Sequence, residues 1–224
     1  MIHLNKLWKY DLKISIVNGS QKKYESNTGI ILDILKIKIN NTHELSFFNC
    51  GINELTGGDY KKIICADAII LAFPLFVHSL PSNTLKFLIE LEKIIKQEQA
   101  CNLIMYAIIN NGFYEGKQNN IAFEILKNWC EHNAVKFGGG IGQGAGEMLG
   151  KMKFIPVNTG FFGNFADALR VMLKKLELRE TFEVIYLSPY FPRFLWKLLA
   201  ERYWKKLAAN NGLKTADMYK FPDD

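Results

Sequence analysis

The chain has 224 residues, of which 49% are hydrophobic and 22% charged, and its net charge is +6 at pH 7. This composition predicts one sizeable globular domain, with or without an extension, and excludes a disordered chain. The basic residues form no block, no apolar run is long enough for a membrane span and the N-terminus lacks the apolar core of an export signal, so we expect a cytoplasmic protein with no nucleic-acid and no membrane partner.

The first predicted elements are a strand over residues 13–18 and a helix over residues 27–40, joined by a polar loop. The strand is a short apolar run rich in β-branched residues, and the helix carries its apolar residues on one face. Five hydroxyl or amide side chains surround the turn at Gly19, and backbone N–H groups of the loop and helix start converge there. Two interpretations stay open, an ordinary helix cap and a binding site for a phosphate monoester.

Strands and helices alternate along the rest of the chain. Further strands are expected over residues 44–50, 68–73, 102–109 and 135–140. Helices are expected after a turn at residues 56–58 and ending near residue 66, from residue 82, over residues 119–132 and over residues 164–178. The run 68–73 is apolar without alternation, which is typical of a parallel strand buried on both faces. The helix after residue 82 shows an apolar stripe of Leu85, Leu88, Ile89 and Ile95. Five strand–helix repeats predict an α/β fold with a doubly wound parallel sheet.

The segments Asn18-Gly19-Ser20 and Ser26-Asn27-Thr28 together resemble the FMN phosphate loop of flavodoxin-like NAD(P)H-dependent FMN reductases, including clostridial-type members. Neither the P-loop motif nor the dinucleotide fingerprint occurs here. The resemblance implies a flavodoxin-like, five-stranded sheet of order 2-1-3-4-5, with FMN as cofactor and NADPH or NADH as co-substrate. It also implies that the FMN phosphate is held by Gly19, Ser20, Lys22, Ser26, Asn27 and Thr28.

Two later loops resemble ring-binding segments of the same reductases. The loop over residues 74–81 has Phe76 where the family often has Tyr, and Gly112-Phe113-Tyr114-Glu115 matches a Gly-Phe-x-Glu motif. The resemblance implies an apolar wall with free N–H groups at Leu75, Phe76 and Val77. The implied ring-binding residues are Pro74, Leu75, Phe76, Val77, His78, Asn110, Asn111, Gly112, Phe113 and Glu115.

Each of these segments also has a structural interpretation. Phe76 could be a core residue, and Asn-Asn-Gly is a strong turn signal. His78 is a candidate ring contact or proton donor, and no other catalytic residue can be assigned. The glycine-rich residues 138–146 predict a structural bend or a lip over the crevice. The cysteines are too dispersed for a metal site, a CxxC pair or an iron–sulfur cluster, at Cys50, Cys65, Cys101 and Cys130.

The organisation expected from the sequence is a flavodoxin-like FMN-binding domain over residues 1–182 and a C-terminal helical extension over residues 183–224. A helix over about residues 191–207 has two apolar faces, which suggests packing on the domain or at a homodimer contact. The resemblance implies an FMN-dependent NAD(P)H oxidoreductase that passes electrons to a small acceptor such as a quinone, a flavin or a nitro compound. The alternative is a non-enzymatic, flavodoxin-like electron carrier.

Overall fold

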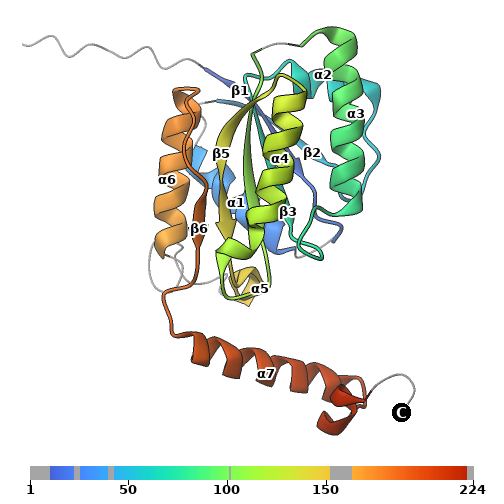
Figure 1. The fold of residues 1–224 in the computed structure, drawn as a ribbon, viewed down its shortest axis with the longest axis vertical. Coiled ribbons are helices and arrows are strands. Elements are labelled where there is room, and N and C mark those ends of the chain that lie inside the picture. Colours follow the sequence, from blue (N-terminus) through green and yellow to red (C-terminus); the bar gives the residue numbers. More distant parts are fainter. Residues whose placement is uncertain (1–10, 23–25, 40–42, 101, 152–162, 221–224) are drawn as a thin grey trace, which may run out of the picture. The chain divides into compact units, whose positions relative to one another are not determined.

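The computed structural model describes residues 11–22, 26–39, 43–100, 102–151 and 163–220. The chain divides into two compact units, Met1–Pro189 and Tyr190–Asp224, which are described separately. The first unit is a parallel sheet with helices on both faces (Figure 1). The second unit contains helix α7 (Arg193–Asn210) and a short 3₁₀ helix, η3 (Thr215–Tyr219). Among the described helices, none combines the length and the apolar character needed to cross a bilayer.

The sheet confirms the predicted doubly wound fold. Its strands are β1 (Lys13–Asn18), β2 (Glu44–Asn49), β3 (Ala68–Pro74), β4 (Ile104–Asn110), β5 (Lys136–Gln143) and β6 (Ile185–Leu187). They follow the order β2-β1-β3-β4-β5-β6 and all pairings are parallel. The first five strands have the flavodoxin-like order. β6 is a sixth strand within the segment that the sequence assigned to the extension, and three residues are too few to show a strand periodicity.

The helices bury the sheet from both sides and so form two hydrophobic cores. Helices α1 (Asn27–Ile39) and α6 (Gly163–Glu177) cover one face, and α2 (Gly57–Ile64), α3 (Ser82–Glu98) and α4 (Asn120–His132) cover the other (Figure 1). The remaining elements are the 3₁₀ turn η1 (Gly116–Asn119) and the short helix α5 (Gly146–Lys151). Every residue of β4 is buried, as expected for a central strand between two layers.

The buried stripe of α3 differs from the predicted one. Leu88 and Ile95 are buried as expected, but Leu85 and Ile89 are about half exposed, at 47% and 48%. Phe87 and Leu91 are buried instead. The face that α3 turns toward the sheet is therefore rotated from the one that the spacing of the aliphatic residues suggested, and it includes the large ring of Phe87.

Most of the glycine-rich segment belongs to strand β5, and residues 144–146 follow the end of that strand. Its first part, Gly138–Gly142, is buried within β5. A side chain at Gly138 would come within 2.4 Å of the Tyr106 ring, and one at Gly140 within 2.3 Å of the Phe123 ring. Glycine here makes room for the ring of Tyr106 on the adjacent strand β4 and the ring of Phe123 on the covering helix α4. The bend expected from the sequence is confined to a register shift against β4, next to Gly139 at φ +122°.

Candidate functional site

A cavity of about 130 Å³ opens at the carboxyl edge of the sheet, where β1, β3 and β4 end. Parallel strands bring the loops that follow them to the same edge, and the position between β1 and β3 is the topological switch point. The cavity is lined by Ser20, Gln21, Lys22, Ser26, Asn27, Thr28, Pro74, Leu75, Phe76, Asn110, Asn111, Gly112 and Glu147. The three loops singled out in the sequence therefore meet at one site.

Asn110, the last residue of β4, connects all of these loops. Its side-chain Oδ1 accepts a hydrogen bond from the Thr28 hydroxyl at 2.8 Å, which ties it to the first turn of α1. Its backbone carbonyl accepts from the N–H of Leu75 at 2.8 Å, which ties it to the loop after β3. Gly146 lies against its side chain, since a Cβ there would come within 3.1 Å of the Asn110 Cβ. One buried residue thus sets the relative position of four loops.

The loop after β1 presents hydrogen-bond donors to the cavity. Ser26 caps α1, because its Oγ accepts from the N–H of Gly29 at 2.9 Å. The Ser20 Oγ accepts from the N–H of Lys22 at 3.4 Å, which leaves the Ser20 hydroxyl hydrogen available to donate. Within the described part of the chain, the N–H groups of Asn27 and Thr28 have no acceptor, as is usual in a first helical turn. The arrangement suits an anion with several acceptor oxygens.

Thr28 differs in role from the other hydroxyl residues of the loop. It lines the cavity, but it is buried and its single hydroxyl hydrogen is donated to Asn110. The hydroxyl oxygen can still accept, but it cannot donate to a phosphate while this bond is made. In this conformation Thr28 therefore positions the site, and its hydroxyl hydrogen is used by Asn110.

Two glycines allow the backbone of this loop to pack closely. A Cβ at Gly19 would lie 2.4 Å from the Thr84 hydroxyl oxygen, and one at Gly51 only 2.0 Å from the Ser20 carbonyl oxygen. The N–H of Gly19 also donates to the Ala72 carbonyl at 2.8 Å, so Gly19 continues the pairing of β1 with β3. Gly19 does not line the cavity, and its contribution is to the shape of the turn.

The loop after β3 is a two-residue hairpin turn. Phe76 and Ser79 exchange both backbone hydrogen bonds, at 3.0 and 2.8 Å, and the two residues between them are left-handed, with φ 48° at Val77 and 59° at His78. The predicted free N–H groups are wrong at two of three positions, because Leu75 donates to Asn110 and Phe76 to Ser79. A β-branched residue at positive φ is unusual, so tertiary contacts must hold the turn in place.

One such contact is a ring pair that joins the loops after β3 and β4. The rings of His78 and Phe113 are stacked, with centroids 5.3 Å apart and planes inclined by 15°. Both side chains are exposed. His78 lies two residues after Phe76 and Phe113 directly follows Gly112, and both Phe76 and Gly112 line the cavity. The pair forms a flat aromatic surface beside the cavity. Val77 is 96% exposed and does not line the cavity.

Asn111 carries an unsatisfied acceptor at the cavity wall. The residue is 3% exposed, and its Nδ2 donates to the Glu115 carbonyl at 3.2 Å, which fixes the orientation of the amide. Its Oδ1 is buried and has no hydrogen-bond partner among the described residues. Such a group is costly unless a donor is supplied from elsewhere, which makes Asn111 a candidate ligand contact. Glu115 contributes its backbone to this arrangement and does not line the cavity.

Two lining residues were missed by the sequence analysis, Gln21 and Glu147. Gln21 lies within the predicted loop, where its side-chain Nε2 donates a hydrogen bond to the Ser82 Oγ at 3.4 Å. Glu147 is in the first turn of α5, directly after β5, and its carboxylate faces Gly112, whose Cβ would lie 3.3 Å from it. Its position after a strand end could have identified it, but the glycine-rich segment gave no reason to single out one acidic residue.

The described residues contain no group of three His, Cys, Asp or Glu side chains placed to hold a metal ion. Cys50 and Cys130 are buried and Cys65 is exposed, while Cys101 lies outside the described residues. Burial raises the pKa of the Cys50 and Cys130 thiols from 9.0 to about 12, so both remain protonated at neutral pH. Their chemistry is that of small apolar side chains.

No protein-family model matches the chain, and no curated protein sequence matches it either. Solved structures do resemble it. It matches the apo form of an NADH:FMN oxidoreductase with a TM-score of 0.54 and 12% identity, over 76% of this chain and 90% of that one. It matches an NADPH-quinone reductase from P. pentosaceus with a TM-score of 0.50 and 14% identity, over 77% and 98%. A third match, to rubredoxin oxygen:oxidoreductase from Desulfovibrio gigas, has a TM-score of 0.44 and 14% identity over 72% of this chain, which spans only 37% of that protein. At these identities the likeness concerns the fold, and together with the strand order it shows that the first unit has a flavodoxin-like fold.

Proposed function

We propose that the chain is an FMN-dependent oxidoreductase that takes electrons from NADH or NADPH and passes them to a small acceptor such as a quinone, a flavin or a nitro compound. The observation that carries the proposal is the convergence of three loops on Asn110 at the switch point of a flavodoxin-like sheet. Two of the solved structures that resemble the chain, with TM-scores of 0.54 and 0.50, are named as an NADH:FMN oxidoreductase and an NADPH-quinone reductase, which supports the same class.

The residues present fit the phosphate end of FMN. The cavity holds about 130 Å³, below the range of roughly 300–1,000 Å³ typical of pockets that enclose a whole ligand, so it suits a phosphate and part of a chain. Ser20 and the N–H groups at the start of α1 would donate to the phosphate oxygens, and the exposed Lys22 would add a positive charge. This set needs no metal ion.

The ring of the cofactor would lie outside this cavity. The stacked His78 and Phe113 rings and the half-exposed Phe76 supply a flat apolar wall at its mouth. The unsatisfied Oδ1 of Asn111 would accept a hydrogen bond from a ligand N–H or O–H group. When bound, the flavin supplies the hydride and electron chemistry, and the protein residues hold and orient it.

The decisive experiment has two stages. In the first, apo-protein is titrated with FMN and with riboflavin, and flavin fluorescence and melting temperature are followed. We expect saturable binding that is tighter for FMN, because only FMN carries the phosphate. Absence of FMN binding would contradict the proposal.

The second stage separates the enzyme from the alternative electron carrier. The FMN-loaded protein is mixed with excess NADH or NADPH and a quinone, and nucleotide oxidation is recorded. Many turnovers per protein support the oxidoreductase, whereas oxidation that stops after one equivalent supports a carrier. Comparing the two nucleotides also determines which is the preferred co-substrate.

We also propose that the protein is a homodimer and that α7 takes part in the contact. The helix leaves Phe194, Leu198, Leu199 and Trp204 at least 40% exposed, and exposed apolar side chains in such number favour an interaction surface. Light scattering on the intact chain tests this. A monomer at micromolar concentration would count against it.

A further inference from the structure

The cavity at the carboxyl edge of the sheet carries hydrogen-bond acceptors as well as donors. Asn111 and Glu147 both line it, and they come from the loop after β4 and the turn after β5. The donors described above, Ser20 and the N–H groups at the start of α1, follow β1 instead. Since β3 separates β1 from β4 in the sheet, the donors and the acceptors reach the cavity from different strand ends.

The two acceptors are held by one set of backbone hydrogen bonds. The N–H of Asn111 donates to the Gln143 carbonyl at 2.9 Å, and the Asn111 carbonyl accepts from the N–H of Gly146 at 2.7 Å. Glu147 is the next residue, and its Oε1 would lie 3.3 Å from a Cβ at Gly112. The loop after β4 and the turn after β5 are thus fastened together, and each brings an acceptor to the cavity.

Both acceptors are unsatisfied within the described part of the chain. The Oδ1 of Asn111 is buried without a partner, and the amide is fixed because its Nδ2 donates to the Glu115 carbonyl at 3.2 Å. The Glu147 carboxylate is exposed and forms no ion pair with any described residue, although Lys22 lines the same cavity. A buried acceptor next to an unpaired carboxylate points to a ligand that supplies hydrogen-bond donors.

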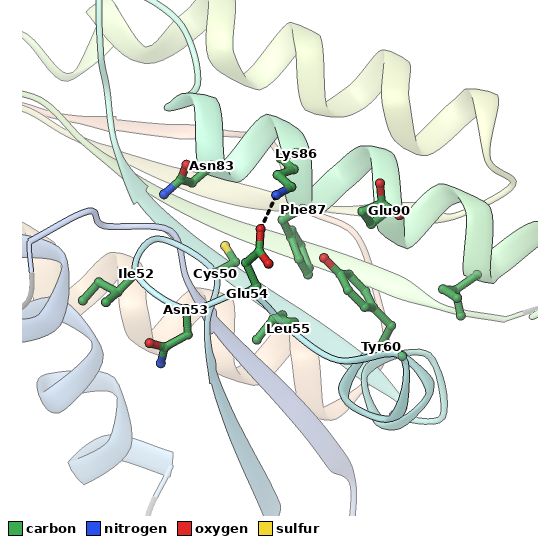
Figure 2. Close-up of a pocket in the computed structure, with 12 residues that line it drawn as sticks. Cys50, Ile52, Asn53, Glu54, Leu55, Tyr60, Asn83, Lys86, Phe87 and Glu90 are labelled. Atoms are coloured by element: carbon green, nitrogen blue, oxygen red, sulfur yellow. Dashed lines mark hydrogen bonds and ion pairs between the residues drawn. The ribbon is translucent and has the colours of Figure 1, made fainter.

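A larger pocket of the same unit has no unpaired charge of this kind. It holds about 440 Å³ between the loop after β2, α2 and α3 (Figure 2). Lys86 pairs with Glu54 at 2.6 Å, which is the dashed line in Figure 2, and Glu90 pairs with Lys93 at 2.8 Å. The charged side chains that line this pocket are therefore already matched, whereas those of the smaller cavity await a ligand.

The charges of the smaller cavity restrict the chemistry of that ligand. A phosphate monoester would use the donors after β1 and the cation of Lys22. The part that reaches Glu147 cannot be a second phosphate, because a carboxylate repels another anion. A cationic amine is disfavoured in turn by Lys22 and by the positive end of the α1 dipole. Neutral hydroxyl groups on the carbons next to the phosphate satisfy both conditions.

We infer that the cavity selects a phosphate ester of a polyol and that Glu147, together with Asn111, determines this specificity by accepting hydrogen bonds from the hydroxyl groups. The inference deepens the proposed function and rests on it, because the ribityl chain of FMN is such a polyol. It gives the turn after β5 a part in binding, whereas the resemblance assigned binding only to the loops after β1, β3 and β4.

The test compares ribitol 5-phosphate with pentyl phosphate, which has the same number of carbons but lacks the hydroxyl groups. Binding to the intact protein is measured by calorimetry. We expect the wild type to bind ribitol 5-phosphate about 3- to 10-fold more tightly, as one net hydrogen bond predicts. Glu147→Leu should abolish this preference, and Glu147→Gln, which keeps an acceptor oxygen, should retain part of it. Glu147→Leu should bind pentyl phosphate at least as tightly as the wild type does, because the repulsion is removed, and a damaged cavity would not give that result.

Glu131→Leu is the matched control, since Glu131 is an exposed acid on α4 and does not line the cavity. Three results would overturn the inference: equal binding of the two probes to the wild type, an unchanged preference in Glu147→Leu, or no saturation by ribitol 5-phosphate up to roughly 10 mM. A parallel FMN titration separates the two proposals. FMN binding without the polyol preference rejects this inference alone, and the preference without FMN binding rejects the flavin function.

Discussion

Thr28 donates its hydroxyl hydrogen to the side-chain oxygen of Asn110 at 2.8 Å, although 82 residues separate them, and both side chains are at least 96% buried. This bond fastens the start of α1 to the end of β4. A bond between two buried polar groups contributes modestly when made, but leaving one partner alone is expensive. The contact therefore fixes both the geometry of the cavity and part of the stability of the sheet edge.

The first prediction concerns this bond. Thr28→Val keeps the shape of the side chain but leaves the Asn110 oxygen buried without its donor, which should lower the free energy of unfolding by about 1–3 kcal/mol. Urea denaturation measures the loss. Thr28→Ser retains the hydroxyl and should lose less than half as much. Equal losses in the two variants would show that the methyl group, not the hydrogen bond, is what matters.

The second prediction concerns phosphate recognition by Ser20. If its free hydroxyl hydrogen is donated to the FMN phosphate, Ser20→Ala removes a charge-assisted bond of about 1.5–3 kcal/mol and weakens FMN binding roughly 10- to 150-fold. Riboflavin affinity should change by less than about twofold, because riboflavin has no phosphate. Ser46→Ala on β2, outside the cavity lining, is the control. Parallel losses for both flavins in Ser20→Ala would argue against phosphate contact.

The third prediction tests the close packing behind the phosphate loop. Gly51→Ala would bring a methyl group to 2.0 Å from the Ser20 carbonyl oxygen, and backbone cannot move aside as a side chain can. We expect a loss of about 1–3 kcal/mol in stability together with weaker FMN binding. Gly57→Ala is a matched control, since a Cβ there meets nothing within 4 Å. Melting curves and FMN titrations of the two variants should differ clearly.

The fourth prediction uses a left-handed residue at a helix end. Gln99 caps α3 with φ 50° and is exposed, a position that glycine occupies without steric cost. Gln99→Gly should raise the free energy of unfolding by up to about 1 kcal/mol. The same substitution two residues earlier, Gln97→Gly, lies within the helix and should lower it by about the same amount. Chemical denaturation that gave both changes the same sign would refute the assignment of the cap.

The fifth prediction follows from the two buried thiols, whose pKa of about 12 in the folded protein compares with 9.0 for a free thiol. Above pH 9 the unfolded chain releases these protons and the folded chain keeps them. The two thiols therefore leave the free energy of unfolding unchanged below pH 9 and lower it as the pH rises from 9 toward 12. Each thiol contributes a slope of about 1.4 kcal/mol per pH unit. Denaturation midpoints between pH 8 and 10 should therefore fall less steeply for Cys50→Ala than for wild type, whereas Cys65→Ala, at an exposed site, should leave the slope unchanged.

Much of the fold could be predicted because the strands that build it carry strong local signals. The unbroken apolar run that became β3 and the polar loop before α1 are legible without a structure, and the order of the first five strands agrees with the resemblance. β6 was missed because three residues are too few to show the alternating pattern of a strand, and because its partner strand, β5, is far away in the sequence. The role of α7 at a subunit contact stays a prediction.

The site was predictable in its location but not in its bonding. Loops that follow parallel strands must meet at one edge, which is why eleven of the predicted residues line the cavity. Whether a hydroxyl points at a ligand or at another side chain depends on tertiary contacts, and so the bond from Thr28 to Asn110 could not be anticipated. The same is true of the N–H groups of Leu75 and Phe76, which the folded loops use themselves.

The left-handed turn at Val77 and His78 bears on the thermodynamics of binding. Non-glycine residues in this conformation cost on the order of 1–3 kcal/mol each, and here the cost is met when the domain folds. The His78 ring is thereby held against Phe113 before any ligand arrives. A planar ligand that settles on this surface loses little affinity to ordering of the protein, so its association should show a small entropic penalty. Replacing Val77-His78 with Asn-Gly would remove the strain of the left-handed backbone and raise the free energy of unfolding. The same change removes the imidazole and should lower the affinity for a planar ligand.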